Sequence, residues 1–338
     1  MSARGRERVI IMTKLLTILK KTLLTLAFPV GMFLVMWLIT ALCGADNFVS
    51  PIIMRQVLTE GSLTAIIALA IYLQFKNGRF DFSGGATMIL TAIIAGNVTY
   101  NAGGNVFMFL GLCIAVGVIL SLITSIIYSF SRVPVIICTI AVTLVYEAIT
   151  YLIFEAKGLN IISYDISKFG KFPFIFIPLI IAILFFLFYS NFTVEGKRGK
   201  LLSMGQRSAV NIGISEKKNV IACYFVTGII LGLGALVYGS QNIISPQSNL
   251  STSSILFSYI VPVFIGMFLG KASVDAVGIA VASVGMAIMN SGLDCLGVGG
   301  GGVQQIIFGM FMLGFYAFSG QFEKLKSLFM RKTLKNTI

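Results

Sequence analysis

The chain has 338 residues, of which 57% are hydrophobic and only 11% are charged. Soluble domains carry roughly 25% charged residues, so this composition excludes a soluble enzyme or DNA-binding module. The apolar runs are long enough to span a bilayer as helices, and they lack the alternation of outer-membrane strands. We therefore predict an all-α polytopic membrane protein.

Ten apolar runs are predicted to cross the hydrocarbon core as helices, since a span needs about 20 apolar residues. In chain order they cover 22–42, 57–75, 82–100, 105–130, 133–154, 173–190, 219–240, 255–270, 274–290 and 303–320. The transmembrane domain is thus predicted over 22–320, between a basic N-terminal segment, 1–21, and a basic tail, 321–338. Ten spans divide into five and five, and an odd number per half gives the opposite orientations of an inverted repeat.

The excess of basic residues is explained by membrane topology. Lys and Arg number 25 against 12 Asp and Glu, for a net charge of +13. With the N-terminus inside, the only basic residues on the outer side are Arg55, Lys157, Lys168 and Lys171. Cytoplasmic loops of membrane proteins collect Lys and Arg, so both termini are predicted to be cytoplasmic and no nucleic acid is invoked. The chain has no His, and we predict neither a metal site nor a cofactor.

Two carboxylates fall inside predicted spans: Glu60 near the outer end of the second and Glu147 deep in the fifth. An intramembrane charge costs a few kcal/mol and suggests a functional site. The alternative is a carboxyl group hydrogen-bonded to a neighbouring helix. Asn97, Thr143 and Asn290 are further polar side chains that are predicted to line a translocation path, although each alone is typical of an interhelical contact.

A charge and flexible backbone meet at the predicted start of the third span, in the run Asp81-Phe82-Ser83-Gly84-Gly85. Asp81 and Ser83 are suited to capping the helix N-terminus. Elsewhere, small residues at four-residue spacing, as in Gly228 and Gly232, predict faces where helices approach closely.

The longest predicted inner loop covers 191–218. Within it, Met204 to Ser215 is predicted to form a short amphipathic helix, with Ala209, Ile212 and Val210 on its apolar side. Gly213 stands where such a helix would stop. An exposed cytoplasmic helix of this kind is suited to bind a protein partner, and lying on the lipid surface is the alternative.

Four stretches together resemble the ribose-type permeases of bacterial ABC importers, in the superfamily that includes the branched-chain amino-acid permeases. They are Gly78 to Gly85, Arg132 to Ile136, Gly205 to Ile214, and Asn290 to Val298 followed by Gln304-Gln305. Their order and spacing are more specific than any one of them. The chain departs from the family pattern at Phe80 and Phe82, where smaller aliphatic residues are usual, and at Gly84, which replaces Val.

The resemblance implies import of a small polar solute, a monosaccharide such as ribose or a related sugar, across the bacterial cytoplasmic membrane. It implies a homo- or heterodimer with a second permease chain, two cytoplasmic ATP-binding subunits that hydrolyse the ATP, and an external solute-binding protein. The permease itself would be a transport subunit surrounded by membrane lipid, not an enzyme. Its ATPase-coupling residues would be Gly205, Gln206, Arg207, Ser208, Ala209, Asn211, Gly213 and Ile214.

Two alternatives remain at this stage. The solute of an ABC importer would instead be a nucleoside or another small molecule. In a different class, an ion-coupled secondary carrier would use Glu147 or Glu60 as its ion site and would need no ATPase.

Overall fold

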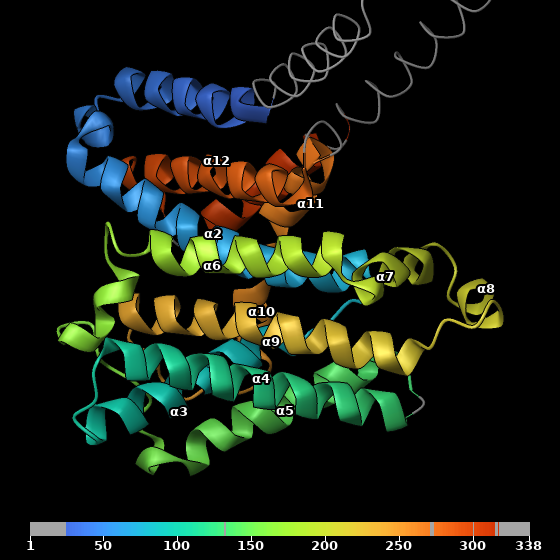
Figure 1. The fold of residues 1–338 in the computed structure, drawn as a ribbon. Coiled ribbons are helices and arrows are strands. Elements are labelled where there is room, and N and C mark those ends of the chain that lie inside the picture. Colours follow the sequence, from blue (N-terminus) through green and yellow to red (C-terminus); the bar gives the residue numbers. More distant parts are fainter. Residues whose placement is uncertain (1–24, 132, 271–273, 300, 315–316, 318–338) are drawn as a thin grey trace, which may run out of the picture.

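The computed structural model describes residues 25–131, 133–270, 274–299, 301–314 and 317. In this part of the chain the regular structure is helical, with one isolated antiparallel bridge between Leu159 and Ile244. The helices lie roughly side by side, with α8 apart from them at one end (Figure 1). In chain order the elements are Thr25–Leu42, η1 (Asp46–Val49), α2 (Pro51–Lys76), α3 (Gly84–Asn101), α4 (Val106–Ser131), α5 (Val135–Leu152), η2 (Phe154–Ala156), η3 (Asp165–Gly170), α6 (Phe176–Leu187), a π turn (Phe188–Phe192), α7 (Val194–Met204), α8 (Gln206–Asn211), α9 (Glu216–Gln241), α10 (Ser251–Ser258), α11 (Ile260–Gly270), α12 (Asp275–Cys295) and Gly302–Gly314.

Seven of the described helical segments are long and apolar enough to cross a membrane. An eighth span is added if the segment from α6 to α7, bent by 74°, is counted as one. The prediction of an all-α membrane protein is confirmed. Each of the ten predicted runs contains a described helix, but α3 is too polar and Gly302–Gly314 too short to pass the same criteria. The number ten therefore stays a prediction.

Local capping explains where several helices begin. Pro51 occupies the first position of α2, where its missing N–H costs nothing, and the Ser50 Oγ accepts a hydrogen bond from the Ile53 N–H at 3.4 Å. Before α9, the Ser215 Oγ accepts from the Lys218 N–H at 3.5 Å. These side chains satisfy N–H groups that the first turn of a helix leaves without intrahelical partners.

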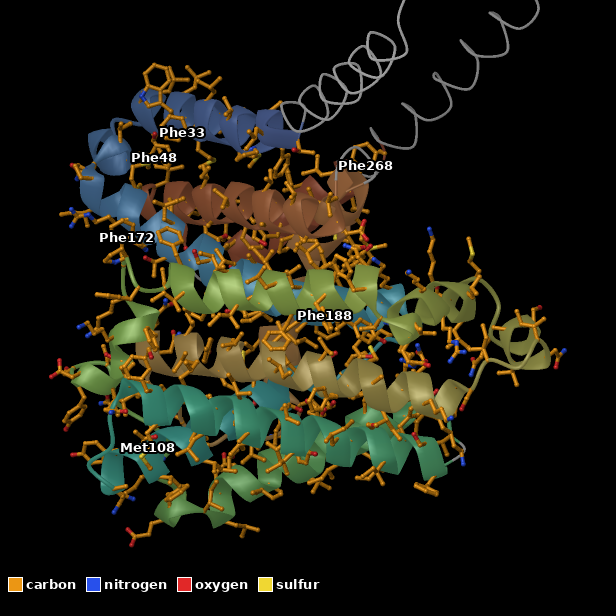
Figure 2. All side chains as sticks on the ribbon, viewed as in Figure 1. Phe33, Phe48, Met108, Phe172, Phe188 and Phe268 are labelled. Atoms are coloured by element: carbon orange, nitrogen blue, oxygen red, sulfur yellow. The ribbon has the colours of Figure 1, made fainter. Side chains whose placement is uncertain are left out.

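The centre of the bundle is formed by α2, α9 and α12, whose apolar stretches are mostly buried. The segment Thr25–Leu42, α4 and α5 instead bury well under half of their apolar stretches. Figure 2 shows exposed apolar side chains on the bundle, among them Met108 of α4 and Phe188 of the π turn. In a bilayer this surface faces lipid or another apolar surface, where no free energy is lost by exposing it.

Glycine allows α4 and α9 to pack in direct backbone contact. A methyl group on Gly232 would overlap the Cys113 carbonyl oxygen, and one on Gly228 would lie 2.7 Å from the Val118 Cα. The predicted small-residue face of α9 is therefore confirmed. The same applies where Gly278 of α12 meets α11.

Candidate functional site

The segment Gly78–Ser83 leads from α2 into α3 and is fixed by short polar contacts. The Asp81 Oδ1 accepts hydrogen bonds from the backbone N–H and the Oγ of Ser83, both at 2.7 Å. The Ser83 side chain makes no bond to the first turn of α3. The predicted capping role is therefore wrong in detail, because Asp81 stabilises the turn before the helix rather than the helix end.

Two threonines of α5 bind the backbone of Phe82, the residue between Asp81 and Ser83. Its backbone N–H donates to the Thr139 Oγ1 at 3.2 Å, and its carbonyl accepts from the Thr143 Oγ1 at 3.2 Å. The start of α3 is thereby attached to the middle of α5. Thr143, predicted to line a path, is buried and serves this attachment in the described structure.

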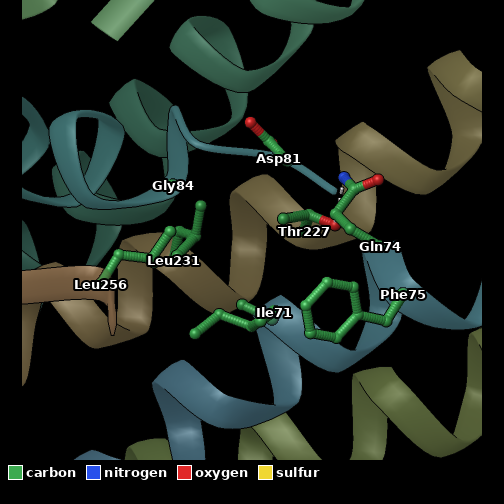
Figure 3. A pocket seen from close by; sticks show the side chains of 9 residues that line it. Ile71, Gln74, Phe75, Asp81, Gly84, Thr227, Leu231 and Leu256 are labelled. Atoms are coloured by element: carbon green, nitrogen blue, oxygen red, sulfur yellow. Dashed lines mark hydrogen bonds between the residues drawn. The ribbon is translucent and has the colours of Figure 1, made fainter. Parts of the chain in front are cut away.

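The glycines at the start of α3 allow close contact with α10. A methyl group on Gly85 would overlap the Thr252 carbonyl oxygen, and one on Gly84 would lie 3.3 Å from the Leu256 Cδ1. Figure 3 shows Gly84 and Leu256 on the wall of a small cavity that Asp81 and Thr227 also line. Its volume is about 10 Å³, room for about one water molecule. Beside it, the Gln74 Nε2 donates to the Thr227 Oγ1 at 3.1 Å.

Glu147 holds the start of α10. Its Oε2 accepts from the Leu250 N–H at 2.8 Å, and its Oε1 accepts from the N–H and Oγ1 of Thr252 at 2.9 and 2.7 Å. The carboxylate is almost completely buried, at 1% exposure. A negative charge at a helix N-terminus is favourable. These three hydrogen bonds therefore give Glu147 a structural role at the start of α10. Its predicted place on a translocation path stays a prediction.

The other predicted path residues lie in two separate places. The Asn97 Nδ2 donates to the Gly158 carbonyl at 2.8 Å, which ties the loop after α5 to α3. The Asn290 Nδ2 donates to the Glu60 Oε1, and the Gln304 Nε2 donates to the Asn290 Oδ1 at 3.2 Å. The structure thus brings Glu60 and Asn290 together across α2 and α12, away from Asn97.

The predicted coupling loop contains two helices, α7 and α8. The second lies within Met204 to Ser215 and confirms the short helix predicted there, whereas the first was not predicted. Gly213 ends the second, with φ at +89°. Its N–H donates to the Val210 carbonyl at 2.9 Å, and the Ile214 N–H donates to the Ala209 carbonyl at 3.1 Å. This pair of bonds is a Schellman motif, which favours glycine at the left-handed position. The predicted stop at Gly213 is confirmed.

The apolar side predicted for this loop is divided between two surfaces. Ala209 is buried in a small cluster with Leu202 and Ile214. Ile212 and Met204 are instead 73% and 76% exposed. The prediction that Ala209 and Ile212 share one apolar side is therefore wrong, because the Schellman turn draws Ala209 inward. Val210 and the polar residues Gln206, Ser208 and Asn211 are also exposed.

A buried polar node, which the sequence did not predict, lies behind this loop. The Arg79 Nη2 donates to the Asn219 Oδ1 at 2.6 Å, and the Asn219 Nδ2 donates to the Glu195 backbone carbonyl at 2.7 Å. Arg79 and Asn219 are both buried. The available signal was the position of Asn219, a polar residue next to the apolar run of α9.

Residues 53–316 match the protein family described as "Branched-chain amino acid transport system / permease component". The chain belongs to this family. The membership confirms the resemblance seen in the four sequence stretches, and the match covers α3, α5, α7, α8 and α10, which carry the site residues.

Similar proteins of known name support the same grouping. The galactose/methyl galactoside import permease protein MglC of Escherichia coli K12 is 23% identical over 82% of this chain and 90% of its own length. The galactofuranose transporter permease protein YtfT of the same strain is 22% identical over 63% of this chain and 67% of its own. The autoinducer 2 import system permease protein LsrD of Escherichia coli SMS-3-5 is 24% identical over 69% of this chain and 73% of its own length.

Membership in this permease family places the chain among transport components rather than enzymes. Together with its apolar helices, it makes the chain a multi-pass protein of the bacterial inner membrane. Permease components of ABC importers work with ATP-binding subunits and solute-binding proteins.

Proposed function

We propose that this permease is the membrane subunit of an ABC importer that moves a monosaccharide or a related small polar solute into the cytoplasm. The three relatives described above are named as import or transport permeases, two of them for galactose-type sugars. None of these three is named for ribose, so the proposal specifies the class of solute and not that sugar.

The observation that carries the proposal is the form of the segment between the π turn and α9. It projects beyond the helix bundle at one end (Figure 1) and exposes Met204, Val210 and Ile212. Its inner side is anchored by the buried cluster around Ala209. Exposed apolar side chains on a locally ordered segment favour a protein partner, and the ATP-binding subunit is the partner that the family implies.

The proposal includes an inverted repeat of five plus five spans and a second permease chain. Relating 22–154 to 173–320 by a twofold axis pairs α2 with α9 and α4 with α12. The packing of α4 on α9 would then correspond to that of α12 on α2, and these are among the most extensive helix contacts in the described structure. The dimer follows from the family resemblance.

Reconstitution tests the function directly. Proteoliposomes would contain the permease with the ATP-binding subunits encoded beside it, and the solute-binding protein would be added outside with radiolabelled D-galactose, D-allose or D-ribose. We expect uptake of at least one sugar that requires ATP and the binding protein and that continues in the presence of a proton uncoupler. Uptake that stops when the ion gradient collapses while ATP is present would instead favour an ion-coupled carrier.

A further inference from the structure

The buried node of Arg79, Asn219 and Glu195 joins the proposed coupling segment to the core of the permease. Arg79 lies in the turn between α2 and α3, Asn219 in the first turn of α9, and Glu195 in the first turn of α7. Asn219 has no exposed surface and bonds to both of the others. A single side-chain amide therefore bridges the coupling segment and the turn that precedes α3.

Two atoms of the node have no hydrogen-bond partner among the described residues. They are the Arg79 Nη1 and the Glu195 Oε2, and both are buried. The other carboxylate oxygen of Glu195 accepts from the Arg198 Nη1 at 2.7 Å. Buried charged groups left without a partner are costly, and each such atom in a native protein needs an explanation. Since these two atoms carry opposite charges, an arrangement that brought them together would satisfy both.

Movement of α7 would reach the turn before α3 directly, because glycines bring the two segments into close contact. A methyl group on Gly78 would lie 2.9 Å from the backbone Cα of Ser203, and one on Gly199 would overlap the side-chain Oδ1 of Asn77. Such close packing deforms little and moves as a unit. A displacement of α7 must therefore shift the turn or break this contact.

The turn between α2 and α3 also determines the position of the start of α3. Asp81 fixes Ser83, and Phe82 is bonded to Thr139 and Thr143 of α5. A path of buried contacts thus runs from α7 through the node to α3 and α5. Contacts of this kind transmit a change only if they have two discrete arrangements.

On the basis of the proposed importer function, we infer that Arg79, Asn219 and Glu195 form a two-state switch that couples the α7–α8 segment to α3. In the described arrangement Asn219 bridges the other two residues. In the second arrangement, reached when the ATP-binding subunit moves α7, the Arg79 guanidinium pairs directly with the Glu195 carboxylate. All three are positioning residues, which set the angle at which α3 enters the bundle.

The test measures the number of sugar molecules imported per ATP hydrolysed, in the reconstituted importer with D-galactose, D-allose and D-ribose as probes. Asn219→Leu keeps the side-chain size and removes the bridge. Glu195→Gln keeps the backbone carbonyl that Asn219 binds and removes the charge needed for the second arrangement. For both variants we expect this ratio to fall about fivefold or more, the lower end of typical coupling between sites, while ATP hydrolysis continues and the complex assembles in normal yield.

Thr124→Val is the matched control, because it removes a buried side-chain contact with Tyr146, between α4 and α5, that lies outside the node. It should leave the ratio unchanged. Wild-type ratios in Asn219→Leu and Glu195→Gln, or an equal loss in Thr124→Val, would overturn the switch. If the Asn219→Leu variant does not insert into the membrane, the ratio measured for Glu195→Gln alone tests the switch. A wild-type complex that hydrolyses no ATP in response to any of the sugars would refute the importer function itself. A wild-type complex that couples normally, together with variants that also couple normally, would refute only the switch.

Discussion

At the scale of single residues, several buried polar side chains of this permease join helices. Glu147 shows why this matters for function. Its carboxylate receives three donors from the start of α10, and one of them is the hydroxyl of Thr252, which can rotate. The two backbone N–H groups cannot. A carboxylate is suited to this position because it only accepts hydrogen bonds.

Glu147→Gln should therefore destabilise the permease although the amide has nearly the same size. One end of the glutamine amide is a donor, so it must face a backbone N–H of Leu250 or Thr252 and leave that group unsatisfied. We expect a loss of about 1–3 kcal/mol in the free energy of unfolding, measured by thermal denaturation in detergent. Uptake by the remaining folded protein should stay ATP-dependent.

Glu155→Gln is the control for that experiment, because Glu155 pairs with Lys157 in the exposed loop after α5. It should leave the denaturation midpoint unchanged. An unchanged midpoint in Glu147→Gln would show that α10 does not depend on the carboxylate. A folded Glu147→Gln protein that lost only gradient-driven uptake would support the ion-coupled carrier.

At the scale of helices, two features have different physical origins. The contact between α4 and α9 depends on the absence of side chains at Gly228 and Gly232. The α7–α8 segment depends instead on a Schellman turn and a small apolar cluster that fix an otherwise polar loop. Substitutions in the contact between α4 and α9 should change the stability of the permease. Substitutions on the exposed side of the α7–α8 segment should change its assembly with the ATP-binding subunit.

Gly232→Val should separate α4 from α9. The added side chain would overlap the Cys113 carbonyl oxygen, and a backbone atom cannot move aside cheaply. Overpacking of this kind costs typically about 1–3 kcal/mol, which thermal denaturation in detergent would detect. Gly111→Val, also in the α4–α9 pair, has open space around its Cα and should have little effect. Equal stability of the two variants would contradict close packing at Gly232.

Ile212→Asp should weaken binding of the ATP-binding subunit without affecting insertion of the permease. Ile212 is 73% exposed and contributes to the apolar surface proposed to contact that subunit. Placing a charge in the core of such a surface removes apolar burial and adds a desolvation cost. Co-purification of the two subunits measures the effect. Ala209→Trp would be less informative, because it disrupts the buried cluster with Leu202 and Ile214.

The exposed Ile243, in the loop after α9, supplies the matched control. Ile243→Asp introduces the same charge at the opposite end of that helix and should leave co-purification normal. If Ile212→Asp also co-purifies in normal yield, the α7–α8 segment is a connector and not the site of coupling.

At the scale of the whole molecule, composition and periodicity predicted the class of fold, and the order of four motifs predicted the family. They did not predict which helices meet. Glu147 and Thr252 are 105 positions apart in the chain, and a hydropathy pattern contains no information about such a pair. Helix α7 was missed for a related reason: the polar loop has little periodicity, so its fold is decided by contacts such as the buried cluster of Leu202, Ala209 and Ile214.

The same basic residues that explain the charge of the chain predict its orientation, which labelling can test. Ser163 and Ser248 are exposed in neighbouring loops joined by the bridge between Leu159 and Ile244. Met204 is exposed beyond the other end of α9, whose 26 residues span about 39 Å. Gly199 is a poor probe, because any side chain there would overlap Asn77.

In a variant without the five natural cysteines, we expect Ser163→Cys and Ser248→Cys to react with an impermeant maleimide in intact cells. Met204→Cys should react only after the cells are permeabilised, because loops rich in Lys and Arg stay in the cytoplasm. Detergent-solubilised protein is the control, since all three cysteines should then react. Reaction of Met204→Cys in intact cells would place the α7–α8 segment outside, where no ATP-binding subunit could reach it, and both the topology and the coupling proposal would be wrong.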